Sequence, residues 1–590
     1  MSQNETEMTT QHSMLVVWGI YAQAFGLIPE LLRIPIQQKT VDHSPQSKIV
    51  EFFLVILAGL NHLQELDTAA EPIVKDLAVA QAWQQPGWAH HSGVSRTLKM
   101  LTQAEAEQIV QMLDRLEQPL INREVMLALA TQGEIILDGD LTPRQVSDTS
   151  RNYPEAAFGH IQGDRVGLGY QSAQVTFRSP TFQRLLLSSV LHPGDVVSNT
   201  QTENLVRAAE ARIGLHPLRR TDLLRKWIDR QSQDSRAKAQ RLTEIQQEVQ
   251  QILGQVADLE QQIQQHPAEL ARLEAEYAAN DRKTRPFSRL AKLRNQLGLL
   301  QRKRERLLKK LPALRKKLER RQEQWAASLQ TEKQLRERLG QHERDNASNA
   351  FPIRAIFRLD AGFASRENLI FLIEMGYEVY TRPFGSWLLS RLKKLTDGKS
   401  WQRVGKNAEM TAWKQYAPED FPYPLDLALE RFQTGDKVKH MLLLHYGADP
   451  VTAQDLAVWF NFYNARQTIE AGNKEGKGTF AMRHLKVRSK SGLYLQEQFG
   501  RFAANFVRFA SQWLVEQGAQ LPSGWNDLQQ PKVKQQVQVG AHTSAKICWL
   551  EQGCLLLSFT DHSVFAGRSL LVSKPIAIQL ALPFAQKVQT

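Results

Sequence analysis

Two apolar segments of the sequence end in acidic residues that could hold a divalent cation. Asp138 and Asp140 lie two residues apart in GEIILDGDLT (residues 133–142), so on a strand they would share one face. Asp360 follows the apolar segment AIFRL in the same way. Carboxylates at the end of a buried strand are costly unless a partner compensates them, and Mg²⁺ is one such partner. The alternative is a turn in which DGD carries solvated acids.

A third acid, Glu470, belongs to a pattern of charged and aromatic side chains. Tyr463, Arg466, Glu470 and Lys477 have the spacing Y-(2)-R-(3)-E-(6)-K. Arg466 and Glu470 are four residues apart, so on one long helix from about Thr452 they would share a face, with Tyr463 one turn earlier. An ordinary surface ion pair would explain two of these residues but not all four.

This spacing resembles the signature of the DDE transposases of bacterial insertion sequences, specifically the family-four group. Two other segments are similar to motifs of that family. One is LDGDLT, in which Thr142 follows Asp140 by two residues, and the other is RLDAGFAS with the helix and the strand YEVYTR after it. The resemblance covers about residues 90–215 and 350–510.

The resemblance implies an α/β fold with a ribonuclease-H-like mixed-sheet catalytic core. It implies that Asp140, Asp360 and Glu470 are the catalytic triad and hold two Mg²⁺ or Mn²⁺ ions. Asp140 is preferred to Asp138 because the family places Thr or Ser two residues after the catalytic Asp, where Thr142 stands here.

The resemblance also implies a reaction and a partner. The protein would act on double-stranded DNA as a homodimer, bind the terminal inverted repeats of its insertion sequence, cleave these ends and join the 3′ ends to target DNA. Tyr463, Arg466 and Lys477 would hold DNA phosphates near the cleaved end. Two alternatives stay open: a domesticated or catalytically silent DNA-binding protein, and a nuclease of the same fold that cuts without joining.

The elements that must position these residues divide the chain into seven expected segments. They are a helical DNA-binding domain (1–130), three parts of a catalytic core (131–222, 349–382 and 451–515), an inserted antiparallel coiled-coil hairpin (223–348), a β-rich insertion (383–450) and a β-rich tail (516–590). In the core, strand-like runs at 165–171 and 173–179 precede a helix at 203–213. The hairpin leaves the order of the catalytic segments intact, because its chain returns to its starting point.

The N-terminal segment contains HHSGVSRTLKMLT (residues 90–102), which is typical of the turn and second helix of a helix-turn-helix. Ser95, Arg96 and Lys99 would then contact DNA. A plain surface helix is the alternative. The β-rich insertion carries three tryptophans, any of which could stack on a flipped base or belong to the core: Trp387, Trp401 and Trp413.

The hairpin is predicted from apolar residues that alternate three and four apart between Leu242 and Ile263. Turn residues at 280–286 separate its two helices, and Pro267 and Pro312 are expected to kink or break them. The net charge is +13, and 17 Lys and Arg face two acids within residues 282–321. This segment could clamp DNA or mediate dimerisation, and repulsion between two copies favours DNA; a solvated helix face would also explain the charge.

Composition excludes several classes of protein. The 590 residues are 42% hydrophobic and 23% charged, unlike a largely disordered or fibrous chain. Cys548 and Cys554 are too few for a disulfide framework or a cysteine-rich zinc module. The apolar run at 52–60 is too short to span a membrane, and the polar N-terminus is unlike a signal peptide. We expect a cytoplasmic, nucleoid-associated protein with no membrane partner.

Overall fold

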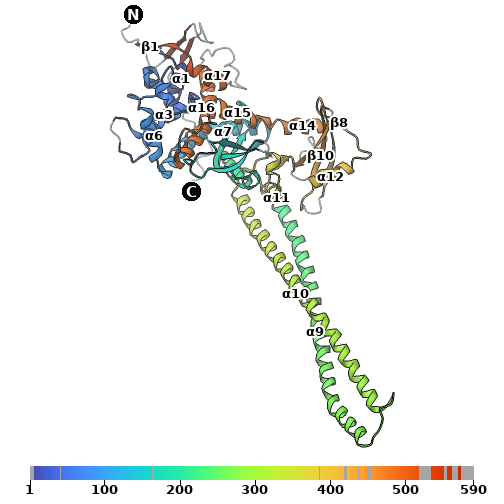
Figure 1. Ribbon diagram of the computed structural model, residues 1–590. Coiled ribbons are helices and arrows are strands. Elements are labelled where there is room, and N and C mark those ends of the chain that lie inside the picture. Colours follow the sequence, from blue (N-terminus) through green and yellow to red (C-terminus); the bar gives the residue numbers. More distant parts are fainter. Residues whose placement is uncertain are drawn as a thin grey trace. The chain divides into compact units, whose positions relative to one another are not determined.

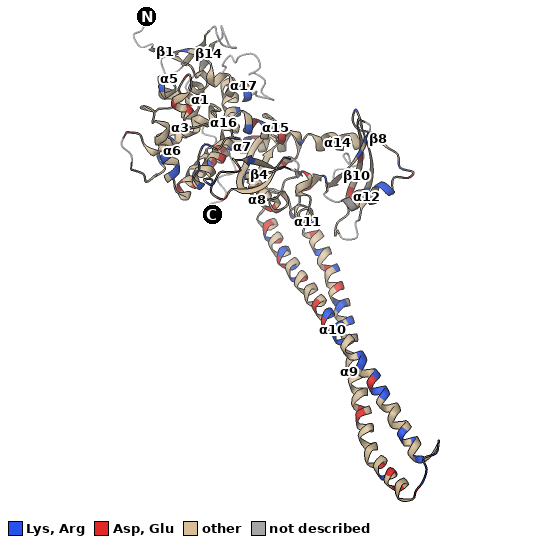
Figure 2. Ribbon diagram, viewed as in Figure 1, with Lys and Arg blue, Asp and Glu red and all other residues tan. Residues whose placement is uncertain are grey.

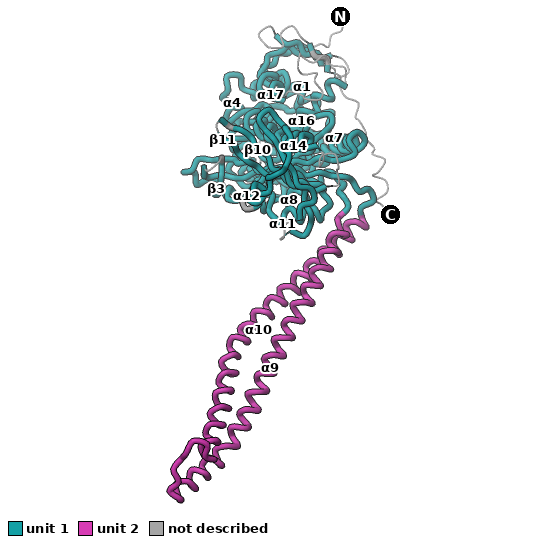
Figure 3. The backbone as a smooth tube through the Cα atoms, turned by 90° about the vertical axis from the view of Figure 1, so that its right-hand side faces the viewer, with its two compact units in different colours: residues 1–218, 349–590 teal, residues 219–348 magenta. Residues whose placement is uncertain are grey.

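The chain forms two compact units, one of residues 1–218 with 349–590 and one of residues 219–348 (Figure 3). The computed structural model describes residues 6–39, 42–162, 165–383, 386–417, 421–435, 437–447, 455–516, 533–550, 555–560 and 569–572. Among the helices in these ranges, none has the length and apolar character that a membrane span requires. Residues 573–590 of the predicted tail and Cys554 lie outside the described residues.

A mixed sheet of ten strands lies at the centre of the first unit (Figure 1). Nine strands follow the order β3-β4-β2-β6-β7-β11-β10-β9-β8, and β5 pairs with β4. The strands are β2 (Ile135–Gln145), β3 (Ala157–Gln162), β4 (Arg165–Phe177), β5 (Leu185–Pro193), β6 (Ala355–Arg358), β7 (Glu378–Thr381), β8 (Gln402–Arg403), β9 (Ala408–Tyr416), β10 (Leu425–Thr434) and β11 (Lys437–Tyr446). Parallel pairing joins β2 to β6 and β6 to β7, and the other pairs are antiparallel.

In the first part of this sheet, the observed strands differ from those predicted from the sequence. The runs predicted at 165–171 and 173–179 are one continuous strand, β4, and β3 and β5 were not predicted. Strand β2 continues past its acids to Gln145 rather than ending at them. Two helices follow their predicted positions, α8 (Thr202–Ile213) before the hairpin and α11 (Arg366–Glu374) between β6 and β7.

The segment predicted as a β-rich insertion extends the central sheet. Strand β11 pairs antiparallel with β7, with Leu444 opposite Thr381, and β10, β9 and β8 follow outward. The segment also contains a helix, α12 (Ser386–Lys394). The strands of the insertion therefore share one hydrogen-bonded sheet with the strands that carry the predicted catalytic acids.

Helices of the N-terminal segment pack on the long helix α16 (Lys490–Glu516). The segment contains α1 (Ser13–Ala24), α2 (Leu27–Leu32), α3 (Pro45–Leu57), α4 (Glu65–Thr68), α5 (Leu77–Ala82), α6 (His91–Met100) and α7 (Gln103–Gln132), and of these α1, α3, α6 and α7 contact α16. Phe53 of α3 lies against Phe499 and Phe502 of α16, with ring centroids 5.2 and 5.5 Å apart. This aromatic packing attaches the helical segment to the core.

The sequence suggested an entirely helical N-terminal segment, but the structure contains a strand there. Strand β1 (Thr6–Thr10) pairs with a strand from the tail in a four-stranded sheet of order β1-β12-β13-β14. The other strands of this sheet are β12 (Ala545–Trp549), β13 (Leu555–Phe559) and β14 (Ser569–Val572). The helix α17 (Val533–Gln538) precedes β12 in the chain. The start of the chain and its tail are thus one layer, a pairing that local sequence patterns do not encode.

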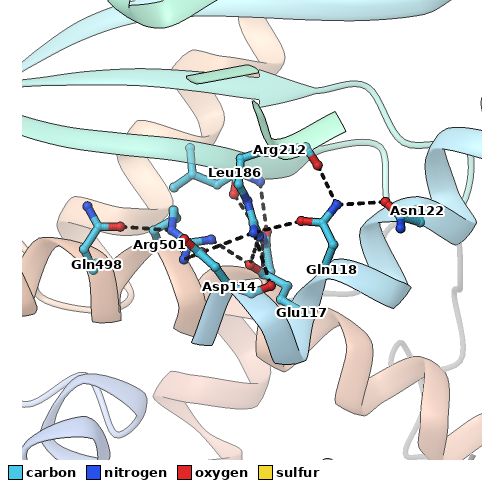
Figure 4. Close-up of polar contacts among 9 residues, drawn as sticks. Asp114, Glu117, Gln118, Asn122, Leu186, Arg212, Gln498 and Arg501 are labelled. Atoms are coloured by element: carbon cyan, nitrogen blue, oxygen red, sulfur yellow. Dashed lines mark hydrogen bonds and ion pairs between the residues drawn. The ribbon is translucent and has the colours of Figure 1, made fainter. Parts of the chain in front are cut away.

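A buried ionic network joins α7, α8 and α16 (Figure 4). Glu117 of α7 is fully buried and accepts hydrogen bonds from Arg212 (2.7 Å), Arg501 (2.6 Å) and Asn505 (2.6 Å). Asp114, one turn earlier, accepts a second bond from Arg501 at 2.6 Å. Two arginines and two acids balance in charge, so their burial depends on all four being present.

The second unit is an antiparallel hairpin of α9 (Thr221–Ala279) and α10 (Arg289–Ser348). Both helices continue through Pro267 and Pro312, so neither proline breaks its helix, which was one of the two expected outcomes. Each proline removes one backbone donor at a cost of about 3 kcal/mol. Apolar packing offsets this cost, since Leu311, beside Pro312, belongs to a buried cluster with residues of α9.

The polar residues that interrupt the apolar pattern of α10 pair across the hairpin. Ser328 lies 2.8 Å from Ser235 and accepts a bond from Gln231 at 2.8 Å. Ser232 donates to Glu332 at 2.7 Å. These bonds are lost if one helix slides along the other, so they fix the register of the hairpin.

The buried network gives a stability prediction. Glu117→Ala leaves Arg212 and Arg501 buried without their shared carboxylate, and we expect the free energy of unfolding to fall by about 3–5 kcal/mol. Urea unfolding measures the change. The control is Glu203→Ala, which removes the exposed pair with Arg207 and should cost less than about 1 kcal/mol. Equal losses in the two variants would contradict a structural role for the network.

Candidate active site

Strands β2 and β6 bring two of the predicted catalytic acids to the same edge of the sheet. The parallel register pairs Ile135 to Asp138 with Ala355 to Arg358 and ends there. Asp140 and Asp360 each lie two residues beyond the last pair, so their side chains follow neighbouring parallel strands in the same direction. Parallel strands place functional groups at their carboxyl ends in this way.

Two consecutive helices carry the remaining residues of the signature. The structure describes α14 (Leu456–Asn464) and α15 (Gln467–Gly478) in place of the single long helix that the sequence predicted. Arg466 lies between them, at the N-cap position of α15. Its guanidinium is 3.3 Å from Glu470, as the i,i+4 spacing predicted, and 3.9 Å from Asp140. Arg466 therefore bridges the helix and strand β2.

The three predicted catalytic acids interact electrostatically around Arg466. Burial raises the pKa of Asp140 to about 6; Arg466 opposes this rise, while Asp360 and Glu470 add to it. Burial also raises the pKa of Asp360, again opposed by Arg466 and reinforced by Glu470. Arg466 thus contacts Asp140 and Glu470, and Asp360 lies close enough to interact electrostatically with all three of these residues.

This charge imbalance fits a divalent cation. Three ionised carboxylates exceed the charge of Arg466 by two, and carboxylate oxygens are the ligands that Mg²⁺ prefers. Asn473, which donates to Asp140 at 2.6 Å, has a buried Oδ1 without a hydrogen-bond partner in the described part of the chain. The oxygens of the triad are not all within 4.8 Å of one another; in the described ranges, that spacing among three ligand atoms occurs at Asp67, His90 and His91.

Asp138 has a different environment from Asp140. It receives two hydrogen bonds from its register partner Arg358, at 2.6 and 2.7 Å, and both side chains are buried. Arg358 also donates to the carbonyl of Phe462 at the end of α14, at 2.8 Å. Asp138 is therefore committed to an ion pair, whereas Asp140 contacts Arg466 and Asn473. This difference agrees with the preference for Asp140.

Helix α15 is held in place by Glu475, a residue that sequence reasoning missed. Its carboxylate accepts hydrogen bonds from Arg184 (2.9 Å), which precedes β5, and from Arg508 (2.8 Å) of α16. Arg184 also lies against Gly472, where a Cβ would be 3.1 Å from its Nε. Asn473 was missed too, although its position three residues after Glu470 places it on the same helical face.

Tyr463 and Lys477 flank the acids. The Tyr463 hydroxyl donates to the carbonyl of Leu359 at 3.3 Å, next to Asp360, and the ring lies under Arg382 at 5.2 Å. Lys477 is partly buried, which lowers its pKa; Asp140 opposes this effect. Tyr463 is 4% exposed, so its ring supports the site rather than presenting a free surface.

A groove of about 790 Å³ extends from Lys477 to helix α6. Its lining includes Arg483, Lys486 and Arg488, from the segment between α15 and α16, and Ser95 from α6. Burial lowers the pKa of Lys486 to about 7, while Glu65 opposes this shift. The sequence contained a signal for this surface in RHLKVRSK (483–490), a basic run directly after the signature.

The helix-turn-helix prediction needs correction. Helix α6 begins at His91, so the Ser-Gly pair at 92–93 lies in its first turn instead of forming the turn before it. Ser95, Arg96 and Lys99 are nevertheless exposed on this helix. The structure therefore supports the expected exposed face without the expected turn.

The tryptophans of the insertion are partly buried where their side chains are described. Arg431 lies over the ring of Trp401 at 4.0 Å, and Lys399 over Trp413 at 5.2 Å. The side chain of Trp387 lies outside the described residues. Neither described ring is shown near the acids.

Comparison with known proteins does not assign the chain. No protein-family model matches it, and no curated protein sequence matches it significantly.

The raised pKa of Asp140 gives a prediction about stability. A folded-state pKa of about 6 against an ordinary value of 3.8 means that the folded protein binds the proton more tightly, so the ionised carboxylate destabilises it above about pH 6. Without divalent cations, Asp140→Asn should raise the free energy of unfolding at pH 7 by about 1–3 kcal/mol. The gain should shrink as the pH falls from 6 and vanish below about pH 4.

Asp138→Asn is the matched control for urea unfolding across this pH range. It leaves the guanidinium of Arg358 buried without its carboxylate, so we expect destabilisation by about 3–5 kcal/mol at pH 7. A loss of stability in Asp140→Asn similar to that in Asp138→Asn would show that Asp140 also serves mainly as a structural ion pair.

Proposed function

We propose that this protein is a DNA transposase that cleaves the ends of its insertion sequence and joins their 3′ ends to target DNA. The observation that carries the proposal is the meeting of Asp140, Asp360 and Glu470 around Arg466. These residues come from three distant parts of the chain, and their assembly is what a catalytic triad requires. An accidental surface ion pair would account only for Arg466 and Glu470.

The order of the core strands supports a ribonuclease-H-like fold. Strands β5, β4 and β2 form an antiparallel run, and β6 and β7 continue it in parallel, giving the order β5-β4-β2-β6-β7. Asp140 belongs to the first of these strands in the chain, Asp360 follows the fourth, and Glu470 lies on a helix after the fifth. The fold of this core is thereby proposed from its topology and its acids together.

The acids would hold two Mg²⁺ or Mn²⁺ ions. When bound, such ions activate the attacking oxygen and stabilise the leaving oxygen in phosphodiester chemistry. The protein's own residues prepare the site: Asn473 orients the Asp140 carboxylate, and Gly362 donates its backbone N–H to Asp360 at 3.0 Å. Arg466 restrains the acids and offers a partly buried cation to a phosphate.

The groove beside Lys477 is the proposed path of the DNA. Arg483 and Arg488 supply positive charge along it, and α6 brings Ser95 to its wall, with Arg96 and Lys99 exposed on the same helix. Phosphate contacts of this kind fix the position of a duplex without reading its sequence. DNA binding here would be strongly salt-dependent.

The hairpin is proposed as a second DNA-contacting surface. Lys and Arg residues recur along much of α10 (Figure 2), and most of those between Arg282 and Arg321 are exposed. Some pair with acids of α9, for example Arg294 with Glu274 at 2.6 Å. The basic residues outnumber these acids, so a polyanion would find unneutralised charge along this helix.

The first test of the function uses the DNA ends that flank the gene. Asp140→Ala, Asp360→Ala and Glu470→Ala should each lower Mg²⁺-dependent nicking and joining by roughly 10²–10³-fold or more, because each removes part of the charge stabilisation. Binding of the ends should largely persist. Product mapping on gels with a plasmid target, with Mg²⁺ and with EDTA, measures both steps.

Glu367→Ala, an exposed acid on α11, is the control and should leave cleavage unchanged. Full cleavage by any of the three triad variants would remove that residue from the proposal. Cleavage by the parent protein without joined product would identify a nuclease, and end binding without cleavage would identify a DNA-binding protein.

The hairpin proposal is tested in the full chain. Replacing Lys309, Lys310, Lys316 and Lys317 of α10 with Gln should weaken DNA binding and lower the log–log salt slope by about 0.9 for each lost phosphate contact. Lys226→Gln on α9 is the control outside the basic segment. An unchanged affinity and slope in the fourfold variant would leave the hairpin as an oligomerisation element, which analytical ultracentrifugation would then examine.

A further inference from the structure

A carboxylate and two imidazoles meet at the start of helix α6, away from the triad. Asp67 of α4 contacts Nδ1 of His91 through Oδ2, and the same oxygen lies 3.3 Å from Nε2 of His90. The three ligand atoms all lie within 4.8 Å of one another. The two rings are adjacent, with centroids 4.2 Å apart, so both histidines approach Asp67 together.

The surroundings of this cluster contain buried carboxyl oxygens that lack hydrogen-bond partners. The second oxygen of Asp67, Oδ1, is buried without a hydrogen-bond partner. Glu51 of α3 is fully buried and accepts the backbone N–H of Ala89 through Oε1 at 2.9 Å, directly before the histidine pair. Its other oxygen, Oε2, is buried and also lacks a partner. Buried carboxylate oxygens left in this state are costly, and a cation would relieve the cost.

We propose that Asp67, His90 and His91 bind one Zn²⁺ ion. Two imidazole nitrogens and one carboxylate oxygen are a usual Zn²⁺ donor set, whereas Mg²⁺ prefers oxygen ligands alone. Three protein ligands leave one position for water or a further group. The proposal is separate from the triad and does not depend on the proposed function.

The hydrogen bonds of His90 are compatible with this role. Its Nδ1 lies 2.9 Å from the Ser92 hydroxyl, which can accept the Nδ1 proton and leave the Nε2 lone pair for the metal. The imidazole of His90 is 65% exposed, so an ion can reach the site from solvent. The other two ligands are more buried and supply rigidity, with side chains 14% (Asp67) and 29% (His91) exposed.

The bound ion would join two elements that are distant in sequence. Asp67 lies on α4, and the histidines begin α6, the helix that presents Arg96 and Lys99. His91 also lines the groove that contains Lys477. The ion would therefore fix the orientation of α6 beside the proposed DNA path.

The test is a Zn²⁺ titration of the untagged full-length protein by calorimetry, with excess Mg²⁺ present to occupy all-oxygen sites. We expect one Zn²⁺ per chain. His90→Asn should weaken binding by about 10-fold or more, because it removes the Nε2 ligand, while Asn is a favoured residue at this N-cap position. A Co²⁺-substituted sample should show the visible absorption of a low-symmetry site in the parent protein and not in the variant.

Asp67→Asn should weaken Zn²⁺ binding similarly, whereas His160→Ala, an exposed histidine on β3, should have no effect. Circular dichroism and the melting temperature in EDTA establish that each variant is folded, and Zn²⁺ should raise the melting temperature of the parent protein more than that of His90→Asn. Absence of Zn²⁺ binding to the parent, or equal binding by the parent and His90→Asn, would overturn the proposal and leave two imidazoles donating hydrogen bonds to Asp67.

Discussion

The buried ion pair between Asp138 and Arg358 joins the segments that carry the candidate site. It links β2 to β6 at the end of their parallel register, and Arg358 continues the link to the last turn of α14 through the carbonyl of Phe462. Asp140 and Asp360 each follow a member of this pair by two residues. Because a buried pair requires both partners in good geometry, the acids that follow it inherit a defined position.

Charge is balanced in the framework and unbalanced in the site. Glu117 and Asp114 meet two arginines in the network behind the sheet, and Asp138 meets Arg358. Asp140, by contrast, shares one guanidinium with two other acids, and its pKa rises as a result of burial. Acids with strongly shifted pKa values are concentrated at functional sites, where residues needed for activity often lower the stability of the fold. Positive charge is concentrated elsewhere, in the groove residues Arg483 and Arg488 of the first unit and along α10 of the second unit.

The fold was predictable where it follows a local period. The three-and-four alternation from Leu242 to Ile263 predicted α9, and the apolar strand before Asp138 predicted β2, because these periods depend only on neighbouring residues. The pairing of β1 with β12 joins Thr10 to Ala545 and has no local signal. The continuity of α10 through Pro312 was also decided by packing, since the opposite helix compensates the lost backbone bond.

For the site, the sequence by itself determined which residue types are available and which of them share a helical face: it placed Arg466 four residues before Glu470, and the ion pair followed. Only the tertiary structure assigned different partners to Asp138 and Asp140, although both stand on the same face of one strand. It also brought Asp67 to the histidine pair at 90–91, to which the helix-turn-helix hypothesis gave no role. The spacing of residues in the sequence determines which side chains point the same way from one helix or strand. Ligands and counter-charges come from other elements, and these meet only when the chain folds.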